Sequence, residues 1–163
     1  MVKSWPVAHV NIGSNKGDRS GNIDRAVALI ASGAAVAPGG RVVRSDVYTS
    51  VPWGYDSPNQ YLNIGIAFPC PLSPHDLLHL LQSVEKAIDP APHRDADGQY
   101  IDRTIDIDII DLGGRVIDTP TLTLPHPRMH LRDFVLRPMA QIDPTWRHPF
   151  LHKTPLALLA TLK

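Results

Sequence analysis

Hydrophobic and polar residues along the chain follow two periods, and these periods predict its strands and helices. Side chains of a strand point alternately to its two faces, so alternation of apolar and polar residues predicts a strand. Four segments have this alternation or the matching composition and are predicted as strands: residues 7–12, 41–50, 60–68 and 102–111.

Two further segments have apolar residues at the spacing of a helix. The apolar face of the first is formed by Ile23, Ala26, Val27 and Ile30. Asn22 is its predicted N-cap, and Gly33 closes it. The second begins with Ser73 as cap and Pro74 in the first turn. Its buried side is formed by Leu77, Leu81, Val84 and Ile88.

The predicted order is strand–helix–strand–strand–helix–strand, with additions at the C-terminus. These additions are a small hairpin at residues 113–118, a partly helical segment at 130–142, and a short helix capped by Thr154 and Pro155. The order predicts an α+β fold, a ferredoxin-like sandwich in which helices pack on an antiparallel sheet. No repeat or linker interrupts the chain, so we expect a single domain over residues 1–163.

Composition narrows the class of protein without identifying it. Hydrophobic residues make up 43% of the 163 residues and charged ones 20%, which is typical of a soluble globular protein. Sixteen Lys and Arg balance 16 Asp and Glu, so bulk charge favours neither nucleic acid nor a membrane as partner. The single cysteine, Cys70, excludes an intramolecular disulfide. With no signal peptide or spanning segment apparent, we expect a cytoplasmic monomer.

The strand at 102–111 combines an apolar face with an acidic one. The apolar face holds Ile105, Ile107 and Ile109, and the opposite face holds Asp102, Thr104, Asp106 and Asp108. Asp106 and Asp108 lie about 7 Å apart along the strand, and their repulsion is on the order of 2 kcal/mol. A solvated edge face is one interpretation. The other is that the two carboxylates hold two magnesium ions together with substrate phosphates.

A basic segment, "HPRMHLRDF" at residues 126–134, follows this strand. It contains His126, Arg128, His130 and Arg132. These side chains could bind a polyphosphate by charge-assisted hydrogen bonds, or they could form a solvated basic turn. Combined with the acidic strand, they give the metal-plus-cation arrangement that is typical of phosphoryl transfer.

Two further pairs of residues share a face of a predicted element. Gln82 and Glu85 are three apart on the second helix and are ordinary surface residues when taken alone. Tyr61 and Asn63 share one face of their strand, where they could belong to the core or could stack on and hydrogen-bond a flat heterocycle. The glycine-containing "GSNKGD" at 13–18 is not a phosphate-binding loop, and turn chemistry with helix capping explains it.

The motifs "GSNKGD", "YLN", "RTIDIDII" and "LPHPRMHLRDFVLRPMAQIDP" occur in this order. Together, from Val10 to about Pro144, the chain resembles the 6-hydroxymethyl-7,8-dihydropterin pyrophosphokinases of folate biosynthesis. The resemblance implies a ferredoxin-like core and transfer of pyrophosphate from ATP to the hydroxymethyl oxygen of the pterin, with release of AMP. It further implies small-molecule substrates and two Mg²⁺ ions.

The resemblance also assigns site residues. It implies catalysis by Arg94, Arg103, Asp106 and Asp108, with the two aspartates as metal ligands. The pterin would contact Ser50, Val51, Trp53, Tyr61, Asn63 and Phe134, with Tyr61 and Phe134 on its two faces. ATP would contact Gln82, Glu85, Arg103, Ile109, Thr123, His126 and Arg132.

One loop departs from the family's pattern. Gln99 and Tyr100 stand where the family has an arginine and a tryptophan, and Arg94 and Arg103 are the arginines that remain, with His93 nearby. We expect this loop, residues 89–102, and the loop at 51–60 to close over the substrates.

Two other functions remain possible from the residues. A non-catalytic RNA-binding module of the same fold would need basic and aromatic residues on its central strands, and the acidic face disfavours it. Another magnesium-dependent phosphotransferase of similar architecture would release ADP in place of AMP.

Overall fold

The structure is a computed structural model that describes residues 4–92 and 94–162. Its strands are β1 (Val7–Ser14), β2 (Val43–Arg44), β3 (Tyr48–Ser50), β4 (Tyr61–Pro69), β5 (Asp106–Leu112), β6 (Ile117–Asp118) and β7 (Thr123–Leu124). Its helices are α1 (Arg19–Ser32), α2 (Pro74–Ile88), the 3₁₀ turn η1 (Met129–Leu131), α3 (Asp133–Ile142) and α4 (Pro155–Leu159). The predicted order of elements is confirmed, except that the strand predicted at 41–50 is divided into β2 and β3.

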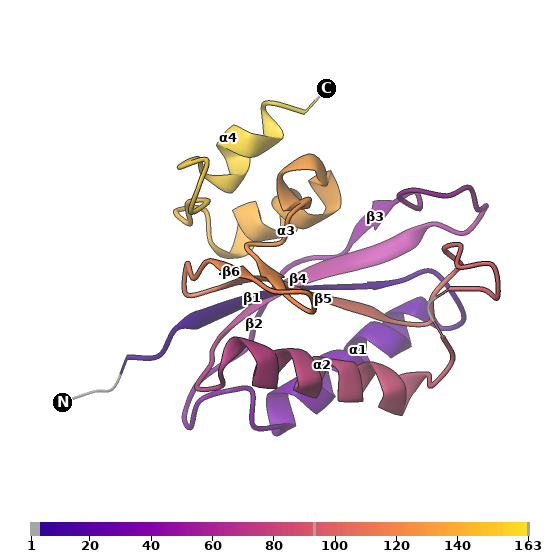
Figure 1. Cartoon of the computed structure of the whole chain (residues 1–163), viewed down its shortest axis with the longest axis horizontal. Coiled ribbons are helices and arrows are strands. Elements are labelled where there is room, and N and C mark those ends of the chain that lie inside the picture. The colour runs from indigo at the N-terminus through magenta and orange to yellow at the C-terminus, as the bar shows by residue number, and fades with distance from the viewer. Residues whose placement is uncertain (1–3, 93, 163) are drawn as a thin grey trace.

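The main sheet is antiparallel and has β1 at its centre. β4 and β5 pair with the two edges of β1, and β2 and β3 both pair with the outer edge of β4. Helices α1 and α2 cover one face of this sheet, and α3 and α4 lie on the other (Figure 1). This arrangement confirms the predicted ferredoxin-like α+β fold. Within the described residues, no helix has the length and apolar character needed to cross a membrane.

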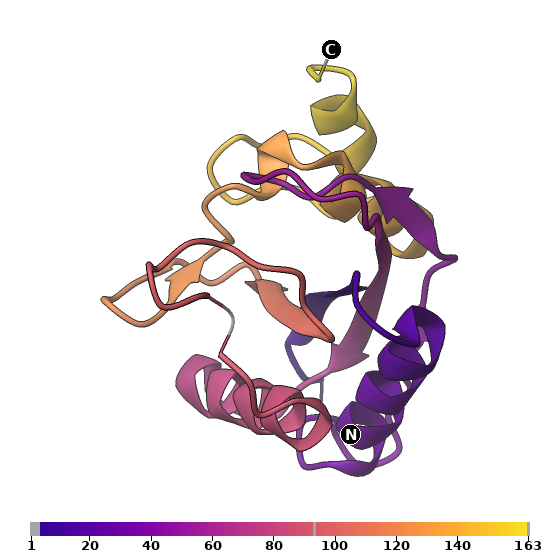
Figure 2. The ribbon, with the colours of Figure 1, turned by 90° about the vertical axis from the view of Figure 1, so that its right-hand side faces the viewer.

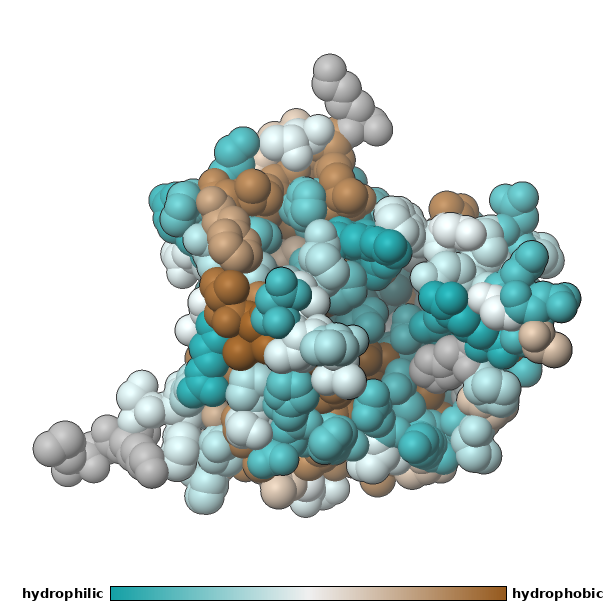
Figure 3. Space-filling model, viewed as in Figure 1, coloured by the Kyte–Doolittle hydropathy of each residue, from teal (hydrophilic) through white to brown (hydrophobic). Residues whose placement is uncertain are grey.

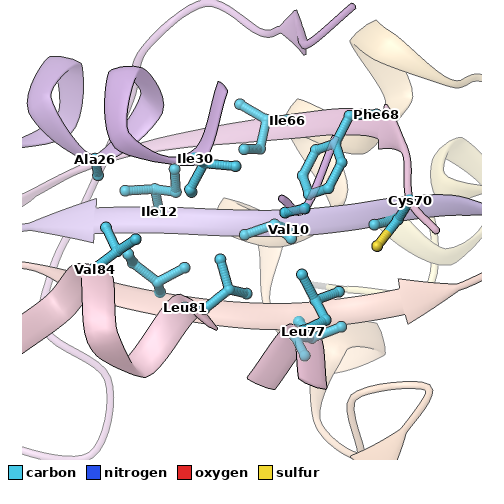
Figure 4. Close-up of a cluster of buried hydrophobic side chains, with 14 of the residues drawn as sticks. Val10, Ile12, Ala26, Ile30, Ile66, Phe68, Cys70, Leu77, Leu81 and Val84 are labelled. Atoms are coloured by element: carbon cyan, nitrogen blue, oxygen red, sulfur yellow. The ribbon is translucent and has the colours of Figure 1, made fainter. Parts of the chain in front are cut away.

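Alternation along the central strands sorts their side chains between two faces. The face toward α1 and α2 carries Ala8, Val10, Ile12, Ile64, Ile66, Phe68, Ile107 and Ile109. They pack against the buried sides of the two helices, among them Ile30 and Leu81 (Figure 4). The helix faces expected from the sequence are thereby confirmed, because Leu77, Leu81 and Val84 are buried and Ile88 is packed against them.

The opposite face of the sheet is only partly covered. A second apolar cluster, which includes Ile110, Leu136, Met139 and Leu158, joins β5 to α3 and α4 at one end. Gly65 of β4 allows α3 to approach closely, because a Cβ atom there would lie 2.8 Å from Cβ of Pro138. The rest of this face is not covered by a helix, and the loops that follow β3 and precede β5 lie at that end of the sheet (Figure 1).

Side-chain caps begin three of the helices, and one predicted cap is wrong. Ser73 and Thr154 cap α2 and α4 as expected, each followed by proline. Asn22 does not cap α1. Asp18 does, by accepting a hydrogen bond from the amide of Gly21 at 3.1 Å. Asn22 lies inside the helix, where its buried amide nitrogen donates to the carbonyl of Lys16 at 3.1 Å and steadies the turn before α1.

The predicted strand at 41–50 is divided into β2 and β3. Between them, Ser45 donates its amide hydrogen to the carbonyl of Gly65 and accepts the Gly65 amide hydrogen on its side-chain oxygen, both at 2.9 Å. A side chain therefore takes the place of a backbone partner in the ladder. The expectation of one continuous strand is wrong for this reason.

The acid-bearing strand begins at Asp106, four residues later than predicted. The backbone of Arg103 pairs with Asn15 beyond the end of β1, and Thr104 donates to Asp89 at 2.6 Å. Asp102 and Thr104 therefore belong to a loop, so their predicted place on the strand face is wrong. Farther along, the strand at 117–118 forms its hairpin with residues 123–124.

Candidate active site

A cavity of about 380 Å³ opens on the uncovered part of the second sheet face. Strands β1, β4 and β5 form its floor, and the loops after β3 and before β5 form its rim. Seen end-on, these two loops face each other across the same end of the sheet (Figure 2). Mostly hydrophilic side chains surround the loop ends on the face drawn in Figure 3.

Strand register fixes which side chains meet on the cavity floor. Gly13 of β1 lies opposite Asn63 of β4 on one side and Asp106 of β5 on the other. Two residues earlier, Asn11 lies opposite Asp108. Since strands are about 4.8 Å apart, the carboxamide of Asn63 and the acidic pair are held about 10 Å from each other.

The glycine at the centre of this row keeps the floor open. A Cβ atom at Gly13 would lie 3.0 Å from Oδ1 of Asn63 and 3.2 Å from Cδ1 of Tyr61. Because Gly13 has no side chain, the ring of Tyr61 can lie across the floor beside the carboxamide.

One half of the cavity has aromatic walls and an oriented amide. Tyr61 rises from β4, and Phe134 comes from the first turn of α3. Asn63 donates from Nδ2 to the carbonyl of Tyr48 at 3.1 Å and to the hydroxyl of Ser50 at 2.8 Å. Its amide plane is therefore fixed, and Asn11 fixes the α3 side by donating to the carbonyl of Phe134 at 3.0 Å. Such a half-pocket suits a flat, polar-edged ring.

The other half of the cavity contains the two carboxylates predicted from the sequence. Asp106 accepts a hydrogen bond from Arg103 at 2.8 Å, and both side chains are largely buried. Burial raises the pKa of Asp108, and the nearby charge of Asp106 raises it further. The acidic pair is therefore held together against its own repulsion, as expected for groups that bind cations.

Cationic and imidazole side chains face the acidic pair. Arg132 lies 4.6 Å over the ring of Trp53 and 5.6 Å over that of Phe134, and its buried Nε has no hydrogen-bond partner among the described residues. Arg128 also lies near Trp53, at 5.6 Å. These guanidinium groups leave donors for an anion in the cavity.

His126 presents one ring nitrogen to this half of the cavity. Its Nδ1 accepts a hydrogen bond from the amide of Arg128 at 3.1 Å, which assigns the proton of the neutral ring to Nε2. Burial lowers the pKa of His126 to about 4, with Arg132 contributing. At neutral pH the imidazole is therefore an uncharged donor.

The loop before β5 supplies the outer rim. Arg94 lies 4.3 Å over the ring of Tyr100, Arg103 lies 5.5 Å from the same ring, and Tyr55 of the opposite loop stacks on it. Tyr100 thus organises the arginines that this loop retains. His93 lies outside the described residues.

The structure brings most of the predicted site residues together. Those that line the cavity are Ser50, Trp53, Tyr61, Asn63, Arg94, Arg103, Asp106, Asp108, His126, Arg132 and Phe134. Those that do not are Val51, Gln82, Glu85, Ile109 and Thr123. The cavity therefore gathers the residues expected at the pterin except Val51, together with Arg103, His126 and Arg132 of those expected at ATP, whereas the other expected ATP contacts lie outside it.

Glu85 lies behind the acidic strand. Its carboxylate accepts a hydrogen bond from the amide of Ile107 at 2.9 Å. Burial raises the pKa of Glu85 to about 8, although that hydrogen bond opposes the shift, and Asp106 and Asp108 add to it. Glu85 thus joins α2 to the edge of β5 next to the acidic pair.

Sequence reasoning missed Asn11, Asn15 and Tyr55. Asn11 had a signal, since it shares the strand face of Gly13, but a lone polar residue on a strand is not diagnostic. Asn15 is buried and its amide nitrogen lies within 3.1 Å of Tyr55, Asn59 and Asp102. Contacts between loops distant in sequence leave no periodic signal.

The carboxylates fit magnesium only in combination with a substrate. Among the described residues, no cluster of three or more His, Cys, Asp or Glu is placed to hold a metal ion. Magnesium is typically bound through one or two carboxylates plus phosphate oxygens and water. Asp106 and Asp108 supply two carboxylates next to a cavity that can admit phosphates, so they meet this requirement.

Comparison with known proteins agrees with this geometry. Residues 9–144 match the family described as 7,8-dihydro-6-hydroxymethylpterin-pyrophosphokinase (HPPK). The 2-amino-4-hydroxy-6-hydroxymethyldihydropteridine pyrophosphokinase of Porphyromonas gingivalis is 35% identical over 144 residues, covering 88% of this chain and 94% of the relative. The enzyme of the same name from Bacillus subtilis is 37% identical over 137 residues, covering 83% and 77%.

Solved structures show the same fold. A crystal structure of HPPK-DHPS in complex with substrates superposes with a TM-score of 0.71 at 12% identity, covering 96% of this chain and 43% of the other. Wild-type Plasmodium falciparum HPPK-DHPS with pteroate gives 0.72 at 12% identity, covering 98% and 43%. This chain spans less than half the length of those proteins. On its sequence match over residues 9–144, the chain belongs to the 7,8-dihydro-6-hydroxymethylpterin-pyrophosphokinase family.

Proposed function

We propose that this chain transfers the pyrophosphate group of ATP to the hydroxymethyl oxygen of 6-hydroxymethyl-7,8-dihydropterin and releases AMP. The observation that carries the proposal is the division of one cavity into an aromatic, amide-bearing half and an acidic, arginine-lined half. A transferase needs its acceptor and donor groups in adjacent subsites, and Gly13 separates these two by a single strand.

The aromatic half binds the pterin. Tyr61 and Phe134 contact its two faces, and Asn63 reads its hydrogen-bonding edge. Backbone groups at Ser50, Val51 and Trp53 complete the contacts. Burial keeps the pKa of Tyr61 far above neutral, so its hydroxyl stays protonated and can donate to Tyr55 across 3.5 Å. The wall next to the pterin is therefore uncharged, as a neutral heterocycle requires.

The acidic half binds the triphosphate. Arg132, Arg103 and the Nε2 hydrogen of His126 donate to phosphate oxygens, and Asp106 and Asp108 would hold two Mg²⁺ ions next to them. The bound Mg²⁺ ions would supply Lewis-acid charge neutralisation on the transferred phosphates. Gln82, Glu85, Thr123 and the backbone of Ile109 bind the remainder of the nucleotide outside the cavity.

The reaction is a direct displacement that uses no side chain as nucleophile. The pterin hydroxyl oxygen loses its proton and forms a bond to the β-phosphorus of ATP. The bond from that phosphorus to the bridging oxygen breaks, and this oxygen leaves with AMP. The side chains align the two reactants, neutralise charge and exclude water. Arg103 lies next to the acidic pair and Arg94 lies at the rim, where both guanidinium groups can donate to the phosphates.

The protein acts as a monomer in the cytoplasm, with small-molecule substrates and without nucleic acid or membrane as partner. It works as one domain over residues 1–163. The cavity lies within one chain, and its floor, walls and rim all come from the described residues, which supports a site complete in each monomer.

Product analysis tests the proposal. The protein is incubated with Mg²⁺, ATP and 6-hydroxymethyl-7,8-dihydropterin, and the nucleotides and pterins are separated by chromatography. We expect AMP and pterin diphosphate in equal amounts. Formation of ADP with a pterin monophosphate would instead identify an ordinary phosphotransferase, and the absence of any pterin product would refute the proposal.

A further inference from the structure

The carboxylate of Asp102 lies at the junction of the two loops that form the cavity rim. It accepts hydrogen bonds from the hydroxyls of Tyr55 at 3.0 Å and Ser57 at 3.1 Å, and from Nδ2 of Asn59 at 2.6 Å. All three donors belong to the loop at 51–60, whereas Asp102 belongs to the loop before β5. A fourth donor is Nδ2 of Asn15, at 2.9 Å.

The charge of Asp102 suits this position. Burial works against the charged form, but the four donors outweigh burial and lower the pKa of the Asp102 carboxyl. Hydrogen bonds to a charged acceptor are about twice as strong as those between neutral groups. One carboxylate therefore makes hydrogen bonds to three residues of the opposite loop.

We infer that Asp102 is a positioning residue that latches the loop at 51–60 over the aromatic half of the cavity. This inference rests on the proposed function. Trp53 and Tyr55 of that loop line the cavity, and the loop contributes little to the core, since Val51 and Trp53 are exposed. Without the latch, pterin binding would have to order this loop, and the entropy lost would weaken affinity.

The neighbouring Arg103 is held in a different way. Its amide hydrogen is donated to Oδ1 of Asn15 at 2.7 Å, and its carbonyl accepts the Asn15 amide hydrogen at 3.0 Å. The second of these bonds joins two backbone groups and does not involve the Asp102 carboxylate. Loss of the latch therefore weakens pterin binding while leaving Arg103, and transfer at saturating pterin, largely intact.

The test compares Asp102→Asn with Asp97→Asn, the same change at an exposed residue of the same loop. Hydrogen exchange of peptides covering residues 51–60 is measured without ligands, and pterin affinity and turnover are measured with 6-hydroxymethyl-7,8-dihydropterin. For Asp102→Asn we expect faster exchange in this loop, a KM for pterin raised about tenfold, and a kcat within about threefold of wild type. Asp97→Asn should match wild type throughout.

A reciprocal exchange distinguishes the latch from a general loss of stability. The double variant Asn59→Asp with Asp102→Asn keeps a charged hydrogen bond between the same two positions, with donor and acceptor reversed. We expect it to recover most of the loop protection and pterin affinity lost in Asp102→Asn.

The inference is overturned if Asp102→Asn and Asp97→Asn show the same exchange and the same KM, or if the double variant is as impaired as Asp102→Asn. Its failure differs from that of the proposed function. A wild-type protein that forms no pterin diphosphate refutes the function, whereas the exchange comparison still decides whether Asp102 holds the loop.

Discussion

Asn63 and Asp106 flank Gly13 in the sheet, one on each neighbouring strand. This register places a carboxamide suited to a heterocycle next to a carboxylate suited to a metal ion, with no side chain between them. Asn63 lies within β4 and Asp106 is the first residue of β5, and both are paired with β1. Their separation is therefore fixed by the hydrogen-bond ladder and not by a mobile loop. The sheet therefore sets the distance between the proposed acceptor and donor subsites.

Because of this register, position 13 has no room for a side chain. A methyl group at Gly13→Ala would lie 3.0 Å from Oδ1 of Asn63 and 3.2 Å from the ring of Tyr61, so one of the two must shift. We expect a pterin affinity about tenfold lower and nearly unchanged ATP binding. Calorimetric titration with each ligand measures both. Equal loss for pterin and ATP would show that the strand itself is disturbed.

Removing one carboxylate of the acidic pair should lower the activity and raise the stability of the protein. In Asp108→Asn, we expect transfer to fall about 1,000-fold because a cation ligand is lost. The same change removes a carboxylate whose charged form is disfavoured by burial and by Asp106, so the variant should be more stable than wild type by about 1 kcal/mol at pH 8. Turnover assays and urea unfolding without Mg²⁺ give the two values. A variant that is both inactive and destabilised would contradict this account.

The aromatic walls should contribute to pterin binding specifically. Tyr61→Ala and Phe134→Ala each remove one stacking surface, which is worth roughly 1–3 kcal/mol, or about 5- to 150-fold in affinity. ATP binding should stay close to wild type in both variants. Unaltered pterin titrations would refute the sandwich. As a matched control, Phe150→Ala removes an exposed ring outside the cavity and should leave pterin affinity unchanged.

The raised pKa of Glu85 predicts that the stability of the protein depends on pH. Its pKa is raised from the ordinary value of 4.5 to about 8, so the folded state binds a proton more tightly than the unfolded state. Stability from this group is fully present below pH 4.5 and is lost as pH rises to about 8. Glu85→Gln keeps an acceptor for the amide of Ile107, and it should unfold at higher urea than wild type at pH 8.5.

The size of this effect should be about 1–2 kcal/mol, because partial solvation of Glu85 reduces the full linkage energy. Urea titrations at pH 5 and pH 8.5, with a chelator present, measure it. The difference between Glu85→Gln and wild type should nearly vanish at pH 5. A constant difference at both pH values would show that Glu85 does not titrate as described.

Local rules predicted most of the scaffold. Alternation located the buried isoleucines of β5, and the Ser73–Pro74 pair located the start of α2, because both depend only on neighbours in sequence. The acidic pair was predicted for the same reason, since Asp106 and Asp108 share a face in any strand. Tertiary contacts could not be predicted from local sequence pattern. Ser45 interrupts a strand through its contact with Gly65, which sequence pattern does not reveal.

The limits of the sequence prediction at the site have the same origin. Asp102 fits the alternating pattern of the predicted strand, but its carboxylate accepts hydrogen bonds from a loop more than 40 residues away. Its backbone therefore lies outside β5. Asn15 and Tyr55 escaped notice because their roles exist only once that loop is in place. Some residues expected to contact ATP, such as Gln82 and Thr123, lie outside the cavity, so their contacts remain predictions.

We propose that Asp106 and Asp108 lie side by side because together they bind divalent cations when nucleotide is present. Calorimetric titration of a non-hydrolysable ATP analogue with and without Mg²⁺, in wild type, Asp106→Ala and Asp108→Ala, tests it directly. We predict that Mg²⁺ tightens nucleotide binding at least tenfold or about 1.4 kcal/mol in wild type and has little effect in either variant. The same Mg²⁺ dependence in all three proteins would contradict the account.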